Sequence, residues 1–173
     1  MSGVNTSTLD NSFLRNLQIV ETITLLAASI FFQFLIHLIP TTGTPLGAVL
    51  LAMFFAPLVA VIFFKVHTAL IVGILSPVLN YFITGLPGAE ILLLMTIELV
   101  LFVSLLYLFF NISRMKKISA LFAVIISMLL SSPITSLLNG YNGNAFSSLT
   151  TAIPGILLLT LLNYLLVRYK EKS

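Results

Sequence analysis

The chain has 173 residues, of which 59% are hydrophobic and only 8% are charged, and its mean hydropathy is +1.16. Ordinary soluble domains carry about a quarter charged residues, so this composition excludes a water-exposed globular fold and favours burial in a lipid bilayer. The net charge of +3 does not indicate a nucleic-acid partner, because the basic residues form no single patch along the chain. Cysteine is absent, which excludes a disulfide framework and a cysteine metal site.

The basic residues divide the chain into three long segments. All eight Lys and Arg residues lie at four places: Arg15, Lys65, a group at 114–117 and a group at 168–172. The segments 16–64, 66–113 and 118–167 are each about 50 residues long and contain no basic side chain. A membrane-spanning helix needs about 20 apolar residues at a rise of 1.5 Å each, so each segment fits a helical hairpin. Three hairpins predict six transmembrane helices in one compact bundle.

In chain order, we expect the spans at residues 18–39, 46–64, 67–84, 90–111, 118–138 and 147–167. Residues 1–17 are expected to form a polar N-terminal tail and residues 168–173 a basic C-terminal tail, which leaves 18–167 as the transmembrane domain. The N-terminal segment lacks the basic and apolar regions of a cleaved signal peptide. Because basic residues mark the cytoplasmic side, the sequence predicts an all-α integral membrane protein with both termini cytoplasmic.

The joins expected on the outer side, near 40–46, 84–90 and 132–147, contain no Lys or Arg and hold most of the glycines. Glycine and proline form shaped turns that present backbone groups. Two interpretations stay open: these loops enclose a small molecule, or they only connect helices. Inside the expected spans, Pro57, Pro77 and Pro154 predict kinks, and Pro77 lies close to Ser76 and Asn80.

Small residues recur every four positions in two spans. The second span carries Ala48, Ala52, Ala56 and Ala60, and the fifth carries Ser119, Ala123, Ser127 and Ser131. Such stripes let helix backbones approach closely in lipid. We favour packing within the bundle, and the alternative is that one stripe docks another membrane subunit.

Glu98 is the polar residue that most requires explanation. It follows Glu90 by eight positions, which places it about 12 Å inside the outer boundary. A charged carboxylate at the centre of a spanning helix costs about 2.5–3.5 kcal/mol on insertion scales. No Lys or Arg lies at a matching depth, so its partner is a neutral donor, a proton or a ligand. Ligand contact or proton handling is one interpretation, and a structural hydrogen bond between helices is the other.

Further polar residues are expected at the outer half of the bundle. Gln33 and His37 lie one turn apart and share a helix face, while Tyr81 offers a ring for stacking. Together these residues predict a ring of hydrogen-bonding groups around an outward pocket. The candidate substrate-binding residues are Glu98, Asn80, Tyr81, His37, Gln33, Asn139 and Tyr141.

The motifs of catalysis are missing. The sequence contains no Gly-rich phosphate loop, no HExxH pair and no GxSxG elbow. His37 and His67 are expected at opposite faces of the membrane, so they cannot share a metal. We therefore expect no enzyme activity, no ATP hydrolysis, no metal and no cofactor.

Three stretches resemble a known family of membrane proteins. They are residues 37–40 (HLIP), residues 45–52 (PLGAVLLA) and residues 73–87 (GILSPVLNYFITGLP), followed by the pair Glu98-Leu99. With six short spans and Gly- and Pro-shaped outer loops, the chain resembles the substrate-binding S components of energy-coupling factor (ECF) vitamin transporters. The quoted motifs cover about a third of the chain.

The resemblance implies capture of a small water-soluble vitamin or related micronutrient at the plasma membrane of a prokaryote. It also implies separate partners, namely an ECF transmembrane scaffold subunit and two cytoplasmic ATPases. Small residues on the early helices would contact the scaffold. Candidates for this docking are Ala48, Ala52, Ala56, Ala60, Thr24 and Ala28.

Two other functions remain open. One is a self-contained proton-coupled transporter that uses Glu98, and the other is a structural or assembly membrane protein. The substitution Glu98→Gln separates them, because it should weaken ligand binding in a capture subunit and abolish proton coupling in a transporter. In a structural protein the same substitution should affect little beyond stability.

Overall fold

The computed structural model describes residues 6–39, 46–85, 88–139 and 145–172, and the regular structure in these ranges is entirely helical. Five helices are long and apolar enough to cross a membrane, and they contain the segments Asn16–Ile36, Val66–Thr84, Ile91–Asn111, Lys116–Leu137 and Ile153–Lys172. A further apolar helical segment, Ala52–Phe63, is shorter. The all-helical class is therefore confirmed, whereas one of the six expected spans is not a single membrane-length helix.

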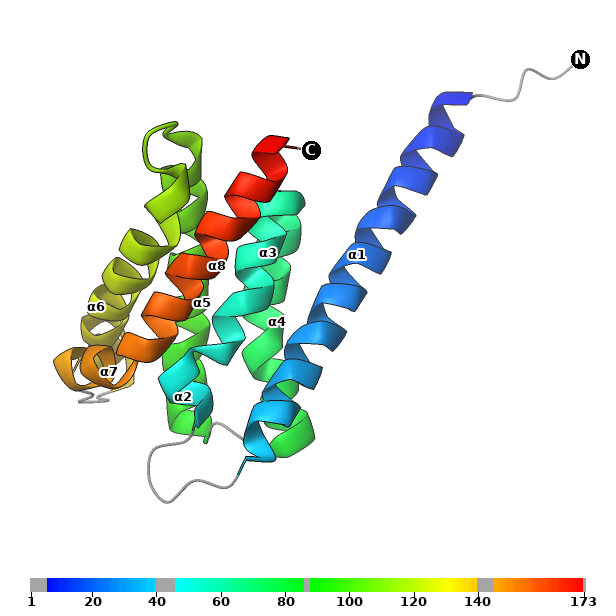
Figure 1. Cartoon of the computed structure of the whole chain (residues 1–173). Coiled ribbons are helices and arrows are strands. Elements are labelled where there is room, and N and C mark those ends of the chain that lie inside the picture. Colours follow the sequence, from blue (N-terminus) through cyan, green and yellow to red (C-terminus); the bar gives the residue numbers. More distant parts are fainter. Residues whose placement is uncertain (1–5, 40–45, 86–87, 140–144, 173) are drawn as a thin grey trace, which may run out of the picture.

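The long helices form a bundle in which α1 (Thr6–His37) and α4 (Val66–Thr84) run in one direction and α5 (Ala89–Asn111) runs in the other (Figure 1). The bundle is completed by α6 (Ser119–Asn139) and α8 (Ile153–Lys172). The N- and C-terminal ends lie at the same end of the bundle, and the short α2 (Leu46–Leu50) and α7 (Ala145–Thr151) lie at the opposite one (Figure 1).

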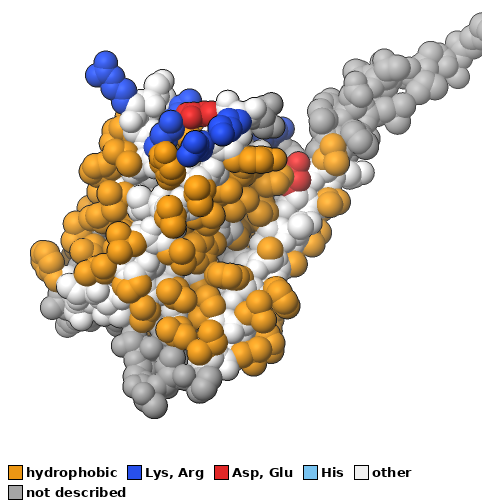
Figure 2. Space-filling view, viewed as in Figure 1, with side chains coloured by type: hydrophobic (Ala, Val, Ile, Leu, Met, Phe, Trp, Pro, Cys, Tyr) orange, Lys and Arg blue, Asp and Glu red, His pale blue; other side chains and the backbone are white. Residues whose placement is uncertain are grey.

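Basic side chains gather at the end of the bundle that carries the termini (Figure 2). We call it the basic end, defined by Lys65, Lys116, Lys117 and Lys170, and we call the opposite one the far end. At the basic end, Nζ of Lys170 donates a hydrogen bond to the carbonyl oxygen of Ile62, and Lys117 pairs with Glu171 at 3.2 Å. The first contact fixes the C-terminal end of α8 to that of α3 (Phe55–Phe63).

The second expected span, residues 46–64, is not one helix. It consists of α2, a 3₁₀ turn η1 (Ala52–Phe54) and α3, with a break at Leu51, whose φ of 53° lies in the left-handed region. A leucine rarely adopts this conformation, so tertiary packing must hold it. Gly155 of α8 supplies that packing, because a Cβ atom at Gly155 would lie 2.6 Å from the carbonyl carbon of Leu50.

The sixth expected span, 147–167, is also divided. α7 ends at Thr151 and α8 begins at Ile153, with a turn at Ala152 between them. Pro154 accounts for this position, since a proline has no N–H to donate to the carbonyl oxygen four residues earlier, crowds that carbonyl with its ring, and is tolerated in the first turn of a helix. Pro57 likewise lies in the first turn of α3, so only Pro77 of the three expected kink sites is inside a helix.

The remaining boundaries agree closely with the sequence, apart from extensions. α4 and α5 match the spans expected at 67–84 and 90–111 within one residue. α6 continues to Asn139, so Pro133, which falls in the outer join expected near 132–147, lies inside this helix. α1 begins at Thr6 and α8 ends at Lys172, so helix covers much of both segments expected as tails.

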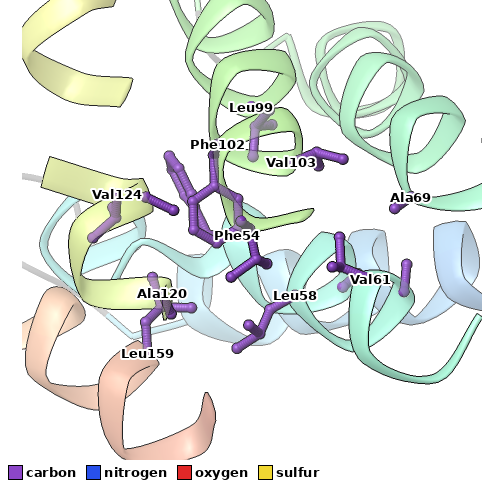
Figure 3. Close-up of a cluster of buried hydrophobic side chains, with 14 of the residues drawn as sticks. Phe54, Leu58, Val61, Ala69, Leu99, Phe102, Val103, Ala120, Val124 and Leu159 are labelled. Atoms are coloured by element: carbon purple, nitrogen blue, oxygen red, sulfur yellow. The ribbon is translucent and has the colours of Figure 1, made fainter. Parts of the chain in front are cut away.

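The buried core is built around α3, although α3 is the shortest of the central helices. Leu58 of α3 and Phe102 of α5 are fully buried, and the rings of Phe54 and Phe102 meet edge to face at 5.0 Å. Figure 3 shows these side chains packed between α3, α4, α5, α6 and α8. In lipid, such close packing replaces the hydrophobic effect as the force that holds helices together.

α1 is less integrated than the other long helices. Its described buried residues, Leu25, Leu26, Ser29, Gln33 and Ile36, all lie in its C-terminal part, and residues 16–24 include none. α1 packs against α4 and against the segment from α2 to α3, and its N-terminal part leans away from the bundle (Figure 1).

Candidate functional site

Polar side chains are buried at similar levels on several helices in the half of the bundle near the far end. Gln33 and Asn80 each lie four residues before the last residue of their helix, which corresponds to about 6 Å from the far end. Ser29 and Ser76 lie one turn further in, at about 12 Å, and Glu98, nine residues after the start of α5, lies at about 13 Å. We call this group the polar band.

The α5–α6 part of the band is internally hydrogen-bonded. The side chain of Glu98 is only 8% exposed, and the hydroxyl of Ser131 donates to its Oε1 at 3.1 Å. The same hydroxyl lies 3.1 Å from the carbonyl oxygen of Met128, and because it has one proton the two acceptors share it. Thr135 donates to the carbonyl oxygen of Ser131 at 2.8 Å. Ser131 is thus the neutral donor that a buried Glu98 requires.

The α1–α4 part of the band differs. We call it the α1–α4 seam and define it as Ser29, Gln33, Ser76 and Asn80, which are each no more than 3% exposed. Within the described residues, Oγ of Ser29, Nε2 of Gln33 and Oγ of Ser76 have no hydrogen-bond partner. A buried polar atom without a partner costs about 1–3 kcal/mol. A fold that retains three of them on two packed helices leaves hydrogen-bonding capacity for another molecule.

The other predicted site residues are only partly placed. Tyr81 is half-buried on α4, and its ring contacts that of Phe82 at 5.7 Å. His37 and Asn139 are the last residues of α1 and α6, which places their backbones at the far end, while their side chains lie outside the described set. Tyr141 lies outside the described residues.

Four residues of the band, Ser29, Ser76, Ser131 and Thr135, were not predicted as site residues. Ser29 precedes Gln33 by one helical turn and therefore lies on the helix face that Gln33 and His37 share. This spacing could have identified Ser29 from the sequence. Ser131 belongs to the stripe of small residues on α6, which we interpreted as helix packing, and Thr135 follows Ser131 by one helical turn. Their partners on other helices could not be inferred from spacing within α6.

The described surface has a wholly apolar groove of about 310 Å³ between α1, α3 and α8. It is lined by Phe32, Phe55, Leu158 and Leu162. With no polar atom in its lining, this groove fits hydrocarbon and offers nothing to orient a polar substrate. It is therefore distinct from the polar band.

The proposed docking residues fall into two groups. Ala52, Ala56 and Ala60 are buried inside the chain itself, so they pack helices together and offer no surface to a partner, and Ala48 is half-buried. Thr24 and Ala28 are exposed on α1. The stripe from Ser119 to Ser131 on α6 is fully buried as well. The burial of most of both stripes is consistent with packing within the chain, and the docking role of Thr24, Ala28 and the alanines stays a prediction.

The described residues contain no cluster of three His, Asp or Glu side chains that could hold a metal ion. Taken together, an all-helical bundle, five helices of membrane-spanning length and an apolar exterior indicate a multi-pass membrane protein. No family model, curated protein or solved structure matches the chain.

Proposed function

We propose that this protein is the substrate-capture subunit of an importer for a small water-soluble molecule, such as a vitamin or related micronutrient, in a prokaryotic plasma membrane. The observation that carries the proposal is the polar band, a set of buried hydrogen-bonding side chains inside helices whose outer surfaces are apolar. Polar groups at membrane depth are costly and typically mark a path or a site for a solute.

The topology of the proposal has six crossings. The segment from α2 to α3 runs from the far end to the basic end and serves as the sixth crossing, although its helix is interrupted at Leu51. Interrupted helices are tolerated at membrane depth where protein surrounds them, and Ala52, Met53 and Phe54 are all buried. The basic end faces the cytoplasm, so the polar band lies toward the outside.

The energy for import comes from other subunits. The sequence has no nucleotide-binding motif, so we propose a transmembrane scaffold and two cytoplasmic ATPases of the ECF type as partners. The exposed Thr24 and Ala28 on α1 are the proposed contact with the scaffold, because small residues allow close helix approach.

Purification from the native host tests the proposal. The tagged protein is extracted in a mild detergent, and co-purifying proteins are identified by mass spectrometry. Recovery of a membrane scaffold with two ATPases supports the capture subunit. Repeated recovery of the protein alone, under conditions that keep an ECF complex intact, contradicts it.

A second function is favoured by one specific observation, the buried carboxylate of Glu98. A protonatable group at membrane depth is typical of proton-coupled transporters, and such a protein would be purified without ATPases. The variant Glu98→Gln adds a check on the first proposal: because Glu98 is buried between α5 and α6, this variant should leave the partner complex intact.

A further inference from the structure

The unpartnered donors on α1 and α4 stand out from the other described buried polar groups. Asn163, a buried amide at the basic half, donates to the carbonyl oxygen of Lys116 at 3.0 Å and lies 3.4 Å from the hydroxyl of Ser119. Ser127 donates to the carbonyl oxygen of Val124 at 2.9 Å. The fold thus satisfies comparable groups elsewhere, and the open hydrogen-bonding capacity is concentrated at Ser29, Gln33 and Ser76.

The chemistry of these atoms restricts what can bind. Nε2 of an amide only donates, and a serine hydroxyl both donates and accepts. No described Lys or Arg belongs to the polar band, since those residues lie at or near the basic end. The one carboxylate, Glu98, already accepts a hydrogen bond from Ser131. A molecule with a full charge would therefore lack a counter-charge in this low-dielectric setting.

We propose that the α1–α4 seam is a binding site for an uncharged polar molecule that presents hydrogen-bond acceptors, such as carbonyl or ring-nitrogen atoms, to Gln33 and the two serines. This inference rests on the proposed function and assigns its substrate site to α1 and α4 instead of to Glu98. The sequence had singled out Glu98, which favours a cationic or donor-bearing substrate. The seam favours an uncharged one.

Admission to the seam requires α1 to move relative to α4, because the four side chains are buried in this structure. α1 is suited to such a movement. Its only described buried stripe runs from Leu25 to Ile36, and residues 16–24 add no buried side chain. Of the side chains on α1, only Leu25 and Leu26 belong to the buried core cluster, whose other members lie outside α1, so a movement of α1 removes few core contacts.

The absence of cysteine makes a direct test possible. Single-cysteine variants Ser29→Cys and Ser76→Cys of the full chain are purified in detergent and treated with N-ethylmaleimide, an uncharged probe with two carbonyl acceptors. A buried thiol in apolar surroundings is inert. We expect labelling of both variants at least about tenfold faster than that of Ser127→Cys, whose parent serine is buried and hydrogen-bonded.

Charged probes test the selectivity. Trimethylammonium-ethyl and sulfonato-ethyl methanethiosulfonate should react readily with Ser113→Cys, at an exposed turn. They should react with Ser29→Cys and Ser76→Cys no faster than with Ser127→Cys. Addition of Gln33→Leu to Ser76→Cys should slow maleimide labelling by about fivefold or more, since the amide donor then no longer holds the probe. Size-exclusion chromatography and circular dichroism verify that each variant is folded.

Two outcomes overturn the inference. Maleimide labelling of Ser29→Cys and Ser76→Cys at the rate of Ser127→Cys means that the seam does not admit the probe. If charged probes label equally fast, or if Gln33→Leu does not change the labelling rate, the seam is accessible but does not recognise the probe through hydrogen bonds. Either result leaves the capture function standing if scaffold and ATPases co-purify, whereas selective labelling without such partners retains the site and rejects the capture function.

Discussion

The α5–α6 interface and the α1–α4 seam place polar side chains at similar depths, yet they differ in how those side chains are satisfied. Between α5 and α6, Glu98 accepts a hydrogen bond from Ser131. On the two packed helices α1 and α4, Ser29, Gln33 and Ser76 each hold an atom without a partner in the described structure. Buried polar groups with partners hold helices together, whereas buried groups without partners are rare in native proteins and require an explanation, which here is the proposed ligand.

The two regions also differ in how firmly their helices are held. α6 carries fully buried small residues such as Ala123 and Ser127, and its contact with α5 is the most extensive between described helices, as expected where small residues allow close backbone approach. α1 offers buried residues only in its C-terminal part. The polar groups of the firmly packed α5–α6 interface are hydrogen-bonded, whereas the buried polar atoms on the more easily separated α1 and on α4 are not. A binding site that opens by movement of one helix requires this arrangement.

The largest loss of stability is expected for a substitution of Gly155, which lies outside both regions. In Gly155→Ala, the new Cβ would lie 2.6 Å from the carbonyl carbon of Leu50 and 2.7 Å from the carbonyl oxygen of Val49. Backbone atoms cannot give way as a flexible side chain does, so we expect a loss of about 3 kcal/mol or more. Thermal unfolding in detergent measures it.

The matched control is Gly73→Ala, where the nearest atom to the new Cβ is Cγ2 of Val103 at 3.4 Å. This variant should be neutral or slightly stabilised, because alanine is the better helix former by up to about 1 kcal/mol. Equal stability of the two variants would show that the break at Leu51 does not depend on Gly155.

The second effect concerns the satisfied interface. In Ser131→Ala the carboxyl group of Glu98 loses its donor, so we expect a loss of about 1–3 kcal/mol in the free energy of unfolding. Ser127→Ala is the control, because Ser127 is equally buried one turn away and donates only within its own helix. Losses of the same size in both variants, measured by unfolding in detergent, would mean that the contact with Glu98 is unimportant.

The third substitution should not lower the stability of the protein, in contrast to the first two. Gln33→Leu removes a buried donor that has no partner, so the ligand-free protein should be unchanged or more stable by up to about 1 kcal/mol. Asn163→Leu removes a buried amide that is hydrogen-bonded, and it should lose about 1–3 kcal/mol. A marked loss of stability in Gln33→Leu would show that its amide group has a structural partner, and would remove the contrast between the two interfaces.

The smallest effect on stability is expected on the outer face of α1. Thr24 is exposed, and its hydroxyl donates to the carbonyl oxygen of Val20 in its own helix. Thr24→Val should therefore change the free energy of unfolding by less than about 0.5 kcal/mol. Ala28→Phe should be similarly stable but should reduce recovery of the scaffold subunit, because its ring prevents close helix approach. Unchanged recovery of the scaffold would exclude this face as the docking surface.

The sequence predicted the helical class and most helix positions because hydropathy and the placement of basic residues control both. It could not predict the break at Leu51, since no glycine or proline lies between residues 48 and 56, and the cause is the close approach of Gly155 from α8. The division near residue 152 did have a local signal in Pro154, which we interpreted as a kink inside a span.

The candidate site shows the same limit. Glu98, Gln33 and Asn80 were predicted as candidate site residues because charged and amide groups are rare in apolar spans. Their division into a satisfied pair and an open seam depends on which helices are neighbours. Ser131 lies 33 positions from Glu98 in the sequence, and no spacing rule connects them.

Native mass spectrometry of the protein purified from its own host tests most directly whether the open seam, and not the satisfied interface, holds the substrate. The wild-type protein should carry a bound small molecule whose mass identifies an uncharged compound. Gln33→Leu should lose it and Ser131→Ala should retain it. A wild-type protein without any bound molecule, or a molecule that persists in Gln33→Leu and is lost in Ser131→Ala, would contradict the account.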